Sequence, residues 1–188
     1  IALGSTVISI LFWLAGFLRM STTGLVAQAY GKNNLTQLAA LLKRSLLLAS
    51  SVALILILLS PLIKHAIAYL SAANSDVLNE AYRYFSIRIF SAPAALCNLV
   101  LLGWMLGVHY GRGPLYLLLV TNIANIVLDI YFVVHLDWAV AGAAWASLIA
   151  DYTALIFALL LVVQLAKKQS ISLAVANWFS IEKMAGIL

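Results

Sequence analysis

Three polar residues interrupt one long apolar stretch of this 188-residue chain: Asn122, Asn125 and Asp129. Their spacing of three and four residues places the side chains on one face of a helix. A carboxylate is costly at membrane depth, and acids found there commonly carry protons or ions. We therefore expect Asp129 to load and release a proton beside the two amides. The competing interpretation is that these residues only fasten helices together through hydrogen bonds of about 1 kcal/mol.

A second acid, Asp151, lies well inside another apolar stretch, with Ser147 one helical turn before it. It is either a second titratable group or a structural pin that a neighbouring helix satisfies, and the sequence leaves both open. Arg19 precedes a short polar run inside the first apolar stretch. That run favours anchoring of Arg19 near the cytoplasmic membrane interface.

The elements that position these residues must be membrane helices. The chain is 65% hydrophobic and only 9% charged, with a mean hydropathy of +1.07, which excludes a water-soluble globule. The apolar runs are too long for the short alternating strands of a membrane β-barrel.

The scattered basic residues form no nucleic-acid footprint, and the single Cys97 builds neither a disulfide nor a metal site. No hydrolase, phosphate-loop or haem motif occurs, so we expect neither an enzyme nor a cofactor.

The apolar runs predict an all-α integral membrane protein with five helices, over residues 1–30, 38–63, 87–108, 115–134 and 140–166. Residues 64–88 mix charges with aromatics and are predicted to form a loop that leads into a helix at the bilayer boundary. Residues 169–188 are predicted to be a cytoplasmic linker. Because the chain starts at Ile1 inside an apolar run, we expect it to be a fragment of a longer protein.

Basic residues at alternate helix ends predict the orientation, because Lys and Arg are enriched in cytoplasmic loops. One side collects the larger group, Lys32, Lys43, Arg44, Arg112, Lys167 and Lys168. The other side has Lys64, Arg83 and Arg88, offset by acids. The chain is therefore expected to enter the membrane from outside and to leave it inside, after at least one earlier helix.

Several stretches taken together resemble the multidrug and toxic compound extrusion (MATE) family, most closely its bacterial DinF-like branch. They are Phe17–Gly31 (FLRMSTTGLVAQAYG), 89–107 (IFSAPAALCNLVLLGWMLG), 111–114 (GRGP), 122–129 (NIANIVLD) and 142–147 (GAAWAS). The resemblance implies twelve helices in two six-helix lobes. Residues 1–168 would be helices two to six of the amino-terminal lobe, followed by the start of the linker between lobes, whereas the first helix and the second lobe of the parent chain would be missing.

The resemblance also implies a function. Family members export small organic, often cationic, compounds in exchange for protons or sodium by alternating access of their lobes. The family's coupling residues match Asn125, Asp129 and Ser147. At the position of Ser147 the family residue is commonly Thr, which also carries a hydroxyl. Tyr84 could supply a further hydroxyl to the same coupling site. Such a protein would be a multi-pass protein of the bacterial cytoplasmic (inner) membrane. The alternatives are a sodium-coupled exporter, a lipid-linked saccharide flippase of the same superfamily, and a non-transporting membrane scaffold.

Overall fold

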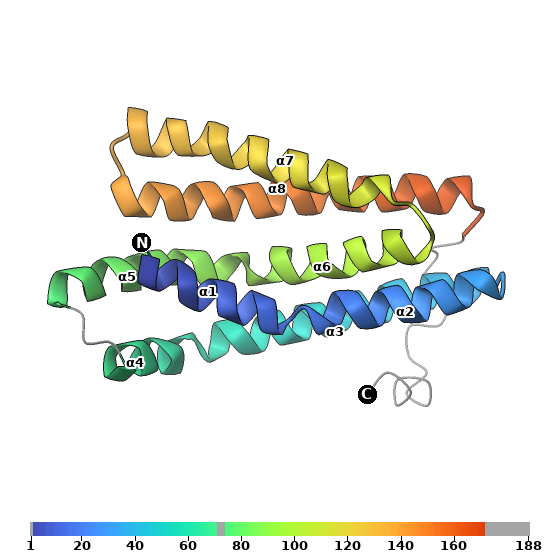
Figure 1. Ribbon diagram of the computed structural model, residues 1–188, viewed down its shortest axis with the longest axis horizontal. Helices are drawn as coiled ribbons and strands as arrows, with labels where there is room; N and C mark the ends of the chain where they lie inside the picture. Colours follow the sequence, from blue (N-terminus) through green and yellow to red (C-terminus); the bar gives the residue numbers. More distant parts are fainter. Residues whose placement is uncertain (1, 71–73, 172–188) are drawn as a thin grey trace.

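The computed structural model describes residues 2–70 and 74–171, and its regular secondary structure there is helical. Five helical segments are long and apolar enough to cross a membrane, which confirms the predicted all-α membrane architecture. They run lengthwise through an elongated bundle (Figure 1). The five segments are Leu3–Gly31, Leu35–Leu58, Ser75–Gly107, Arg112–His135 and Ala139–Lys168.

Two helices form the first span, α1 (Ala2–Leu14) and α2 (Phe17–Gly31), with a tight turn at Gly16 between them. The chain reverses after α2 through Asn33, whose φ of 52° lies in the left-handed region that Asn tolerates better than most residues. Asn34 then caps α3 (Leu35–Leu58) by accepting a hydrogen bond from the backbone N–H of Gln37 at 3.0 Å. The short α4 (Ser60–Leu70) follows.

The third span is longer than the sequence predicts. It consists of α5 (Ser75–Arg88), a 3₁₀ turn η1 (Ile89–Ser91) and α6 (Ala92–Gly107). Residues 64–88, predicted as a loop that leads into a helix, are therefore mostly helical themselves, in α4 and α5. The cause is an amphipathic pattern in α5: its acids Asp76 and Glu80 are exposed, whereas Ala81, Tyr84 and Phe85 face the bundle and are buried.

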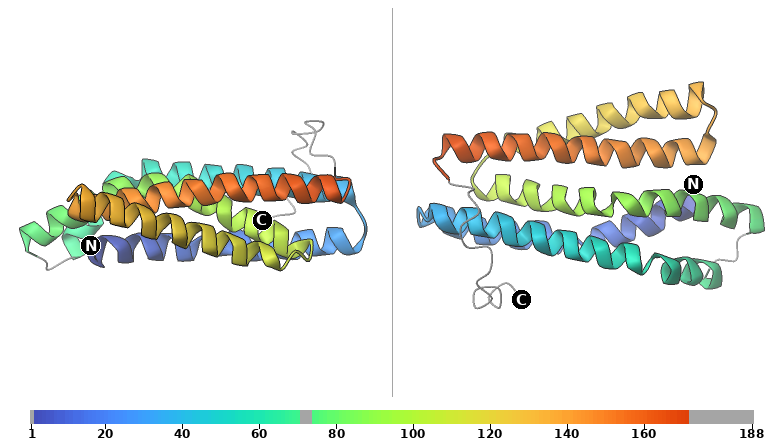
Figure 2. Two further views of the ribbon diagram at one scale, coloured as in Figure 1. Left: turned by 90° about the horizontal axis from the view of Figure 1, so that it is seen from above. Right: turned by 180° about the vertical axis from the view of Figure 1, so that it is seen from behind.

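The last two spans lie side by side (Figure 1, and from two further directions in Figure 2). They are α7 (Arg112–Asp129), which continues into a π-helical turn η2 (Ile130–His135), and α8 (Ala139–Lys168). α8 also packs on α6, and its buried side is a stripe of alanines at every fourth position: Ala146, Ala150, Ala154 and Ala158. Small residues of this kind let membrane helices approach closely.

Four basic residues counted at membrane ends lie within spans instead. Lys43 and Arg44 stand more than two turns inside α3, and Arg83 and Arg88 stand at least as far inside the third span. The bias that remains has Lys32, Arg112, Lys167 and Lys168 at one end and Lys64 at the other. The orientation stays a prediction. The predicted linker lies mostly outside the described residues, which end at residue 171.

α2 and α6 approach closely at the two glycines of a G-x-x-x-G motif on α6. A Cβ added at Gly107 would lie 2.6 Å from the Cβ of Val26, and one at Gly103 would lie 2.7 Å from the carbonyl oxygen of Arg19. Trp104, between them, is fully buried and donates a hydrogen bond from Nε1 to the carbonyl of Leu38 on α3 at 3.1 Å. This contact sets the spacing of α2, α3 and α6.

We predict that Gly107→Ala lowers the stability of the protein by about 1–3 kcal/mol, because the added methyl overpacks the α2–α6 contact. The matched control is Gly24→Ala on α2, where a Cβ would meet nothing within 4 Å. That change removes a helical glycine and should leave stability equal or slightly raised. Thermal unfolding in detergent measures both variants, and equal midpoints would contradict the prediction.

Candidate functional site

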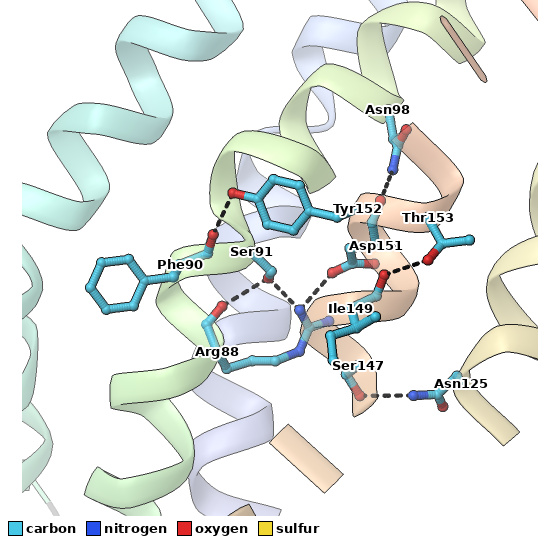
Figure 3. A network of polar contacts seen from close by, with 10 residues as sticks. All are labelled: Arg88, Phe90, Ser91, Asn98, Asn125, Ser147, Ile149, Asp151, Tyr152 and Thr153. Atoms are coloured by element: carbon cyan, nitrogen blue, oxygen red, sulfur yellow. Dashed lines mark hydrogen bonds and ion pairs between the residues drawn. The ribbon is translucent and has the colours of Figure 1, made fainter. Parts of the chain in front are cut away.

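Asn125, Asp129 and Ser147 meet between α7 and α8. The amide nitrogen of Asn125 lies 3.1 Å from the Ser147 hydroxyl oxygen (Figure 3). When the amide is turned over, its oxygen accepts from Ser147 Oγ at 3.1 Å and from the Ser147 backbone N–H at 3.2 Å, and its nitrogen donates to Asp129 Oδ2 at 3.2 Å. We assign this second orientation because every end of the amide then has a suitable partner.

Local backbone geometry places Asp129 at this meeting point. It is the last α-helical residue of α7, and the wider π-helical turn follows directly. π-Helical turns in α-helices are rare and frequently occur at functional sites. This turn sits tightly on α8, since a Cβ at Gly142 would lie 3.1 Å from the backbone of Phe132. The second carboxyl oxygen of Asp129, Oδ1, is buried and has no hydrogen-bond partner among the described residues.

Asp151 lies one turn further along α8 and has a different partner. Its Oδ2 accepts a hydrogen bond at 2.6 Å from Arg88 Nη1, and the two side chains are only 16% and 14% exposed (Figure 3). The same Arg88 nitrogen donates to the hydroxyl of Ser91. The guanidinium also lies over the ring of Phe12 on α1, 5.8 Å from its centroid. A charged pair with these added contacts is the arrangement that low-polarity surroundings tolerate.

Two more hydrogen bonds tie α8 to the third span at the same level (Figure 3). Asn98 on α6 donates to the backbone carbonyl of Asp151 at 3.0 Å, and Tyr152 donates to the carbonyl of Phe90 at 3.0 Å. Phe90 belongs to the 3₁₀ turn, which interrupts the regular backbone bonding of the span. The region around Asp151 is therefore a firmly connected joint between two spans.

Not all of the predicted residues come together. Asn125, Asp129 and Ser147 form one group, whereas Asp151 pairs with Arg88 and no described contact links it to Asp129. Asn122 is exposed on α7, and Tyr84 is buried against α1 beside Gly4.

The sequence interpretation missed Arg88, which was counted at the outer membrane end. The one sequence signal was its position directly before the apolar run that begins at Ile89, since its partner Asp151 lies on another span.

An apolar cavity of about 370 Å³ opens beside this joint, between α3, η1 and α8. Phe90, Trp145 and Tyr152 supply much of its wall. The hydroxyl of Tyr152 is already used by the Phe90 carbonyl, and Ser86, which also lines the cavity, donates to the Tyr82 carbonyl at 2.5 Å. The cavity therefore offers apolar contact and is separate from the polar site at Asp129.

Comparison with known proteins identifies the family. Residues 1–131, more than half of the chain, match the family model MatE. The chain belongs to the MatE family. The helical spans and the relatives of this family together make it a multi-pass membrane protein.

Named relatives of this MatE chain come from bacteria and plants. It is 50% identical over 173 residues to DNA damage-inducible protein F of Escherichia coli (strain K12), a match that covers 92% of this chain and 38% of the relative. It is 40% identical over 95 residues to Protein DETOXIFICATION 43 of Arabidopsis thaliana, covering 50% of this chain and 18% of the relative. The chain thus spans well under half the length of either protein.

A solved structure has the same fold. The crystal structure of MATE in the bent conformation superposes with a TM-score of 0.89 at 21% sequence identity. The superposition covers 100% of this chain and 42% of that one. At this identity the likeness establishes the fold and leaves the roles of individual residues to chemistry.

We predict that Asp151→Asn destabilises the protein by about 3–5 kcal/mol, because it leaves the buried Arg88 without a counter-charge. The double variant Arg88→Gln with Asp151→Asn removes both charges and should recover at least half of the loss. Glu80→Gln, which changes an exposed acid of α5, is the control and should have no effect. Thermal unfolding measures all three variants, and equal losses in the single and double variants would contradict the pairing.

Proposed function

We propose that this chain is part of a secondary efflux transporter of the bacterial cytoplasmic membrane that exchanges protons for small organic, often cationic, compounds. The family match and the E. coli relative support a transporter, and the relatives give no reason to expect an enzyme. Its partners would be the lipid bilayer, the organic substrates and the remainder of the parent chain. It would need no cofactor, and the proton would be its coupling ion.

The contrast between two membrane carboxylates carries this proposal. Arg88 neutralises Asp151, and several hydrogen bonds hold that pair in place. Asp129 has one neutral amide donor and a second oxygen without a partner, and no basic side chain of the described residues lies within ion-pair distance. A carboxyl group can exchange protons readily where a proton displaces no salt bridge. Asp129 is therefore the better coupling residue.

These contacts support a transport cycle in which Asp129 carries the coupling proton. Asp129 takes a proton from the outer side. Protonation removes the negative charge of its carboxyl group and weakens the hydrogen bond that it accepts from the Asn125 amide. Since Asn125 also bonds Ser147, the change reaches α8 and alters how α7 and α8 pack. The rearranged lobe binds cargo less tightly and releases it outside. Loss of the proton to the inner side then resets the site.

Sodium is the second candidate coupling ion. Asp129 Oδ1 has no hydrogen-bond partner, and with the Asn125 amide turned back so that its nitrogen donates to Ser147, its oxygen would face Asp129 and offer a hard cation an amide oxygen as well as the carboxylate. No cluster of three or more His, Cys, Asp or Glu residues occurs in the part of the chain that the structure describes. We favour the proton because a single carboxylate within a membrane span suffices for it.

We predict that Asp129→Asn in the full-length protein abolishes proton-driven efflux, because the amide cannot exchange the coupling proton. The assay follows a lipophilic fluorescent cation in proteoliposomes under an imposed pH gradient. Asp137→Asn is the matched control, since Asp137 is an exposed aspartate in the loop just after the π-helical turn. It should transport like the wild type.

Other outcomes discriminate between the alternatives. Efflux that follows a sodium gradient and not a pH gradient would assign sodium. The absence of cation efflux under either gradient in folded protein would turn attention to a flippase or a scaffold. Normal proton-driven efflux by Asp129→Asn would exclude Asp129 as the coupling residue.

We predict that Ser147→Ala lowers proton-driven efflux several-fold, because one hydrogen bond worth about 0.5–1.5 kcal/mol is lost at the amide. Ser147→Thr keeps the hydroxyl and should stay within about twofold of the wild type. Initial rates in the same vesicles measure this difference. Equal rates for the alanine and threonine variants would show that the hydroxyl takes no part in coupling.

A further inference from the structure

The apolar cavity between α3, η1 and α8 has one wall on the third span. Ser86, Ile87 and Phe90 supply that wall, at positions that share one face of a helix. Viewed from behind the bundle, the third span lies between α3 and α8 (Figure 2, right). Ile57 of α3 and Leu148 of α8 line the two flanks of the cavity. Its volume of about 370 Å³ falls in the range of specific ligand sites.

The chemistry of the cavity wall suits hydrocarbon. Its two hydroxyl groups already donate to backbone carbonyls, Ser86 to Tyr82 at 2.5 Å and Tyr152 to Phe90 at 3.0 Å. The rings of Phe90 and Trp145 are 55% and 42% exposed, so they remain open to an occupant of the cavity. An apolar occupant gains from burial against such a wall, whereas a polar one finds no free hydroxyl there.

A positive charge stands next to this cavity on the same helix face. Arg83 precedes Ile87 by one helical turn on α5, on the side away from the middle of the span. The Arg83 side chain is exposed and makes no ion pair within the described residues. Arg88 lies on another face of the same helix and is neutralised by Asp151. Arg83 is therefore the charge that an anionic group beside the cavity would meet.

Arg83 lies at the depth of lipid headgroups, although it is more than two turns inside α5. The third span has 33 residues, about 50 Å of helix, whereas the hydrocarbon layer is about 30 Å thick. The other end of the span is Gly107, and the exposed His109 and Arg112 follow it. Arg83 is about 36 Å from that end along the axis. The cavity, one turn further in, therefore lies within the hydrocarbon layer.

An exposed tryptophan marks the same level on α8. The third span and α8 run in the same direction, and the Tyr152–Phe90 hydrogen bond joins them (Figures 1 and 3). Trp145 lies about two turns before Tyr152, as Arg83 lies about two turns before Phe90. Tryptophan is enriched where membrane helices meet the headgroup region. The basic and the aromatic residue therefore agree on the position of the membrane boundary.

The next charge along this face of α5 has the opposite sign. Glu80 is exposed and precedes Arg83 by three residues, again on the same face and further from the middle of the span. The order from the bilayer outward is thus apolar cavity, positive charge and negative charge. An amine-bearing phospholipid has the complementary order of acyl chain, phosphate and ammonium. A guanidinium binds phosphate through parallel charge-assisted hydrogen bonds, and basic sites on membrane proteins hold lipid headgroups in this way.

We propose that this surface binds a molecule of phosphatidylethanolamine. Its phosphate lies on Arg83, its ammonium group lies near Glu80, and one acyl chain enters the cavity. The bound chain contacts α3, the third span and α8 together, beside the Arg88–Asp151 pair. The lipid is neither cargo nor coupling ion, so the inference goes beyond the proposed function and does not rest on it.

Native mass spectrometry of the full-length protein in detergent, titrated with dioleoylphosphatidylethanolamine, tests the site. The wild type should retain one lipid molecule more tightly than any other. Arg83→Gln removes the phosphate ligand and Leu148→Trp fills the cavity, so each should weaken that binding at least fivefold. Arg112→Gln and Leu118→Trp make the same changes at exposed positions of α7 and should bind as the wild type does.

The headgroup and the acyl chain are tested separately. The wild type should bind phosphatidylethanolamine at least threefold more tightly than phosphatidylglycerol, and Glu80→Gln should abolish this preference. Soluble glycerophosphoethanolamine has the same headgroup without acyl chains and should not displace the lipid at equal concentration. Equal binding of the two lipids by the wild type would contradict the assignment of the headgroup, and displacement by the soluble compound would contradict the role of the cavity.

Wild-type affinity in both Arg83→Gln and Leu148→Trp, or equal losses in the control variants, would overturn the site. A wild type that retains no lipid would also overturn it, in favour of a cavity filled by the remainder of the parent chain. A second measurement covers a Leu148→Trp variant that fails to fold. Phosphatidylethanolamine with brominated acyl chains should quench the tryptophan fluorescence of the wild type more than that of Arg83→Gln or Trp145→Phe, and equal quenching in all three would refute the proposal.

Discussion

Burying a charged side chain in the hydrocarbon layer is costly, so the packing of these helices depends on which intramembrane charges are paired. Arg88 and Asp151 neutralise one another across two spans, and the interrupted helix at η1 lies where they meet. Hydrogen bonds from Asn98 and Tyr152 reinforce the same level. α8 is therefore held to the third span at a fixed register. α7 packs on α8, so the position of Asp129 depends on how the Arg88–Asp151 pair fixes α8.

α8 contributes to two polar contacts, and one of them is held more firmly than the other. Ser147 and Asp151 are one turn apart on this helix, yet the first faces the amide of Asn125 and the second an arginine. A salt bridge with several supporting hydrogen bonds resists change, whereas a carboxyl group with one amide donor can alter its protonation at little cost to its neighbours. A fixed joint next to a changeable contact is a suitable arrangement for passing a local charge change to a helix pair.

The sequence by itself determined the class of the protein, the number of spans and the group on α7, because hydropathy and helical spacing are local properties. Asn125 and Asp129 share a face in any α-helix, and five apolar runs must become helices where water cannot satisfy the backbone. Sequence reasoning also singled out Ser147, but through family resemblance.

The tertiary structure alone decided which charges are paired. Arg88 and Asp151 are 63 positions apart, and no local pattern indicates that two spans bring them to 2.6 Å. It also placed Tyr84 against α1 and extended the third span back to Ser75. The physical reason is that the fate of a membrane charge depends on the partner across the helix interface, and helix packing, not spacing along one helix, chooses that partner.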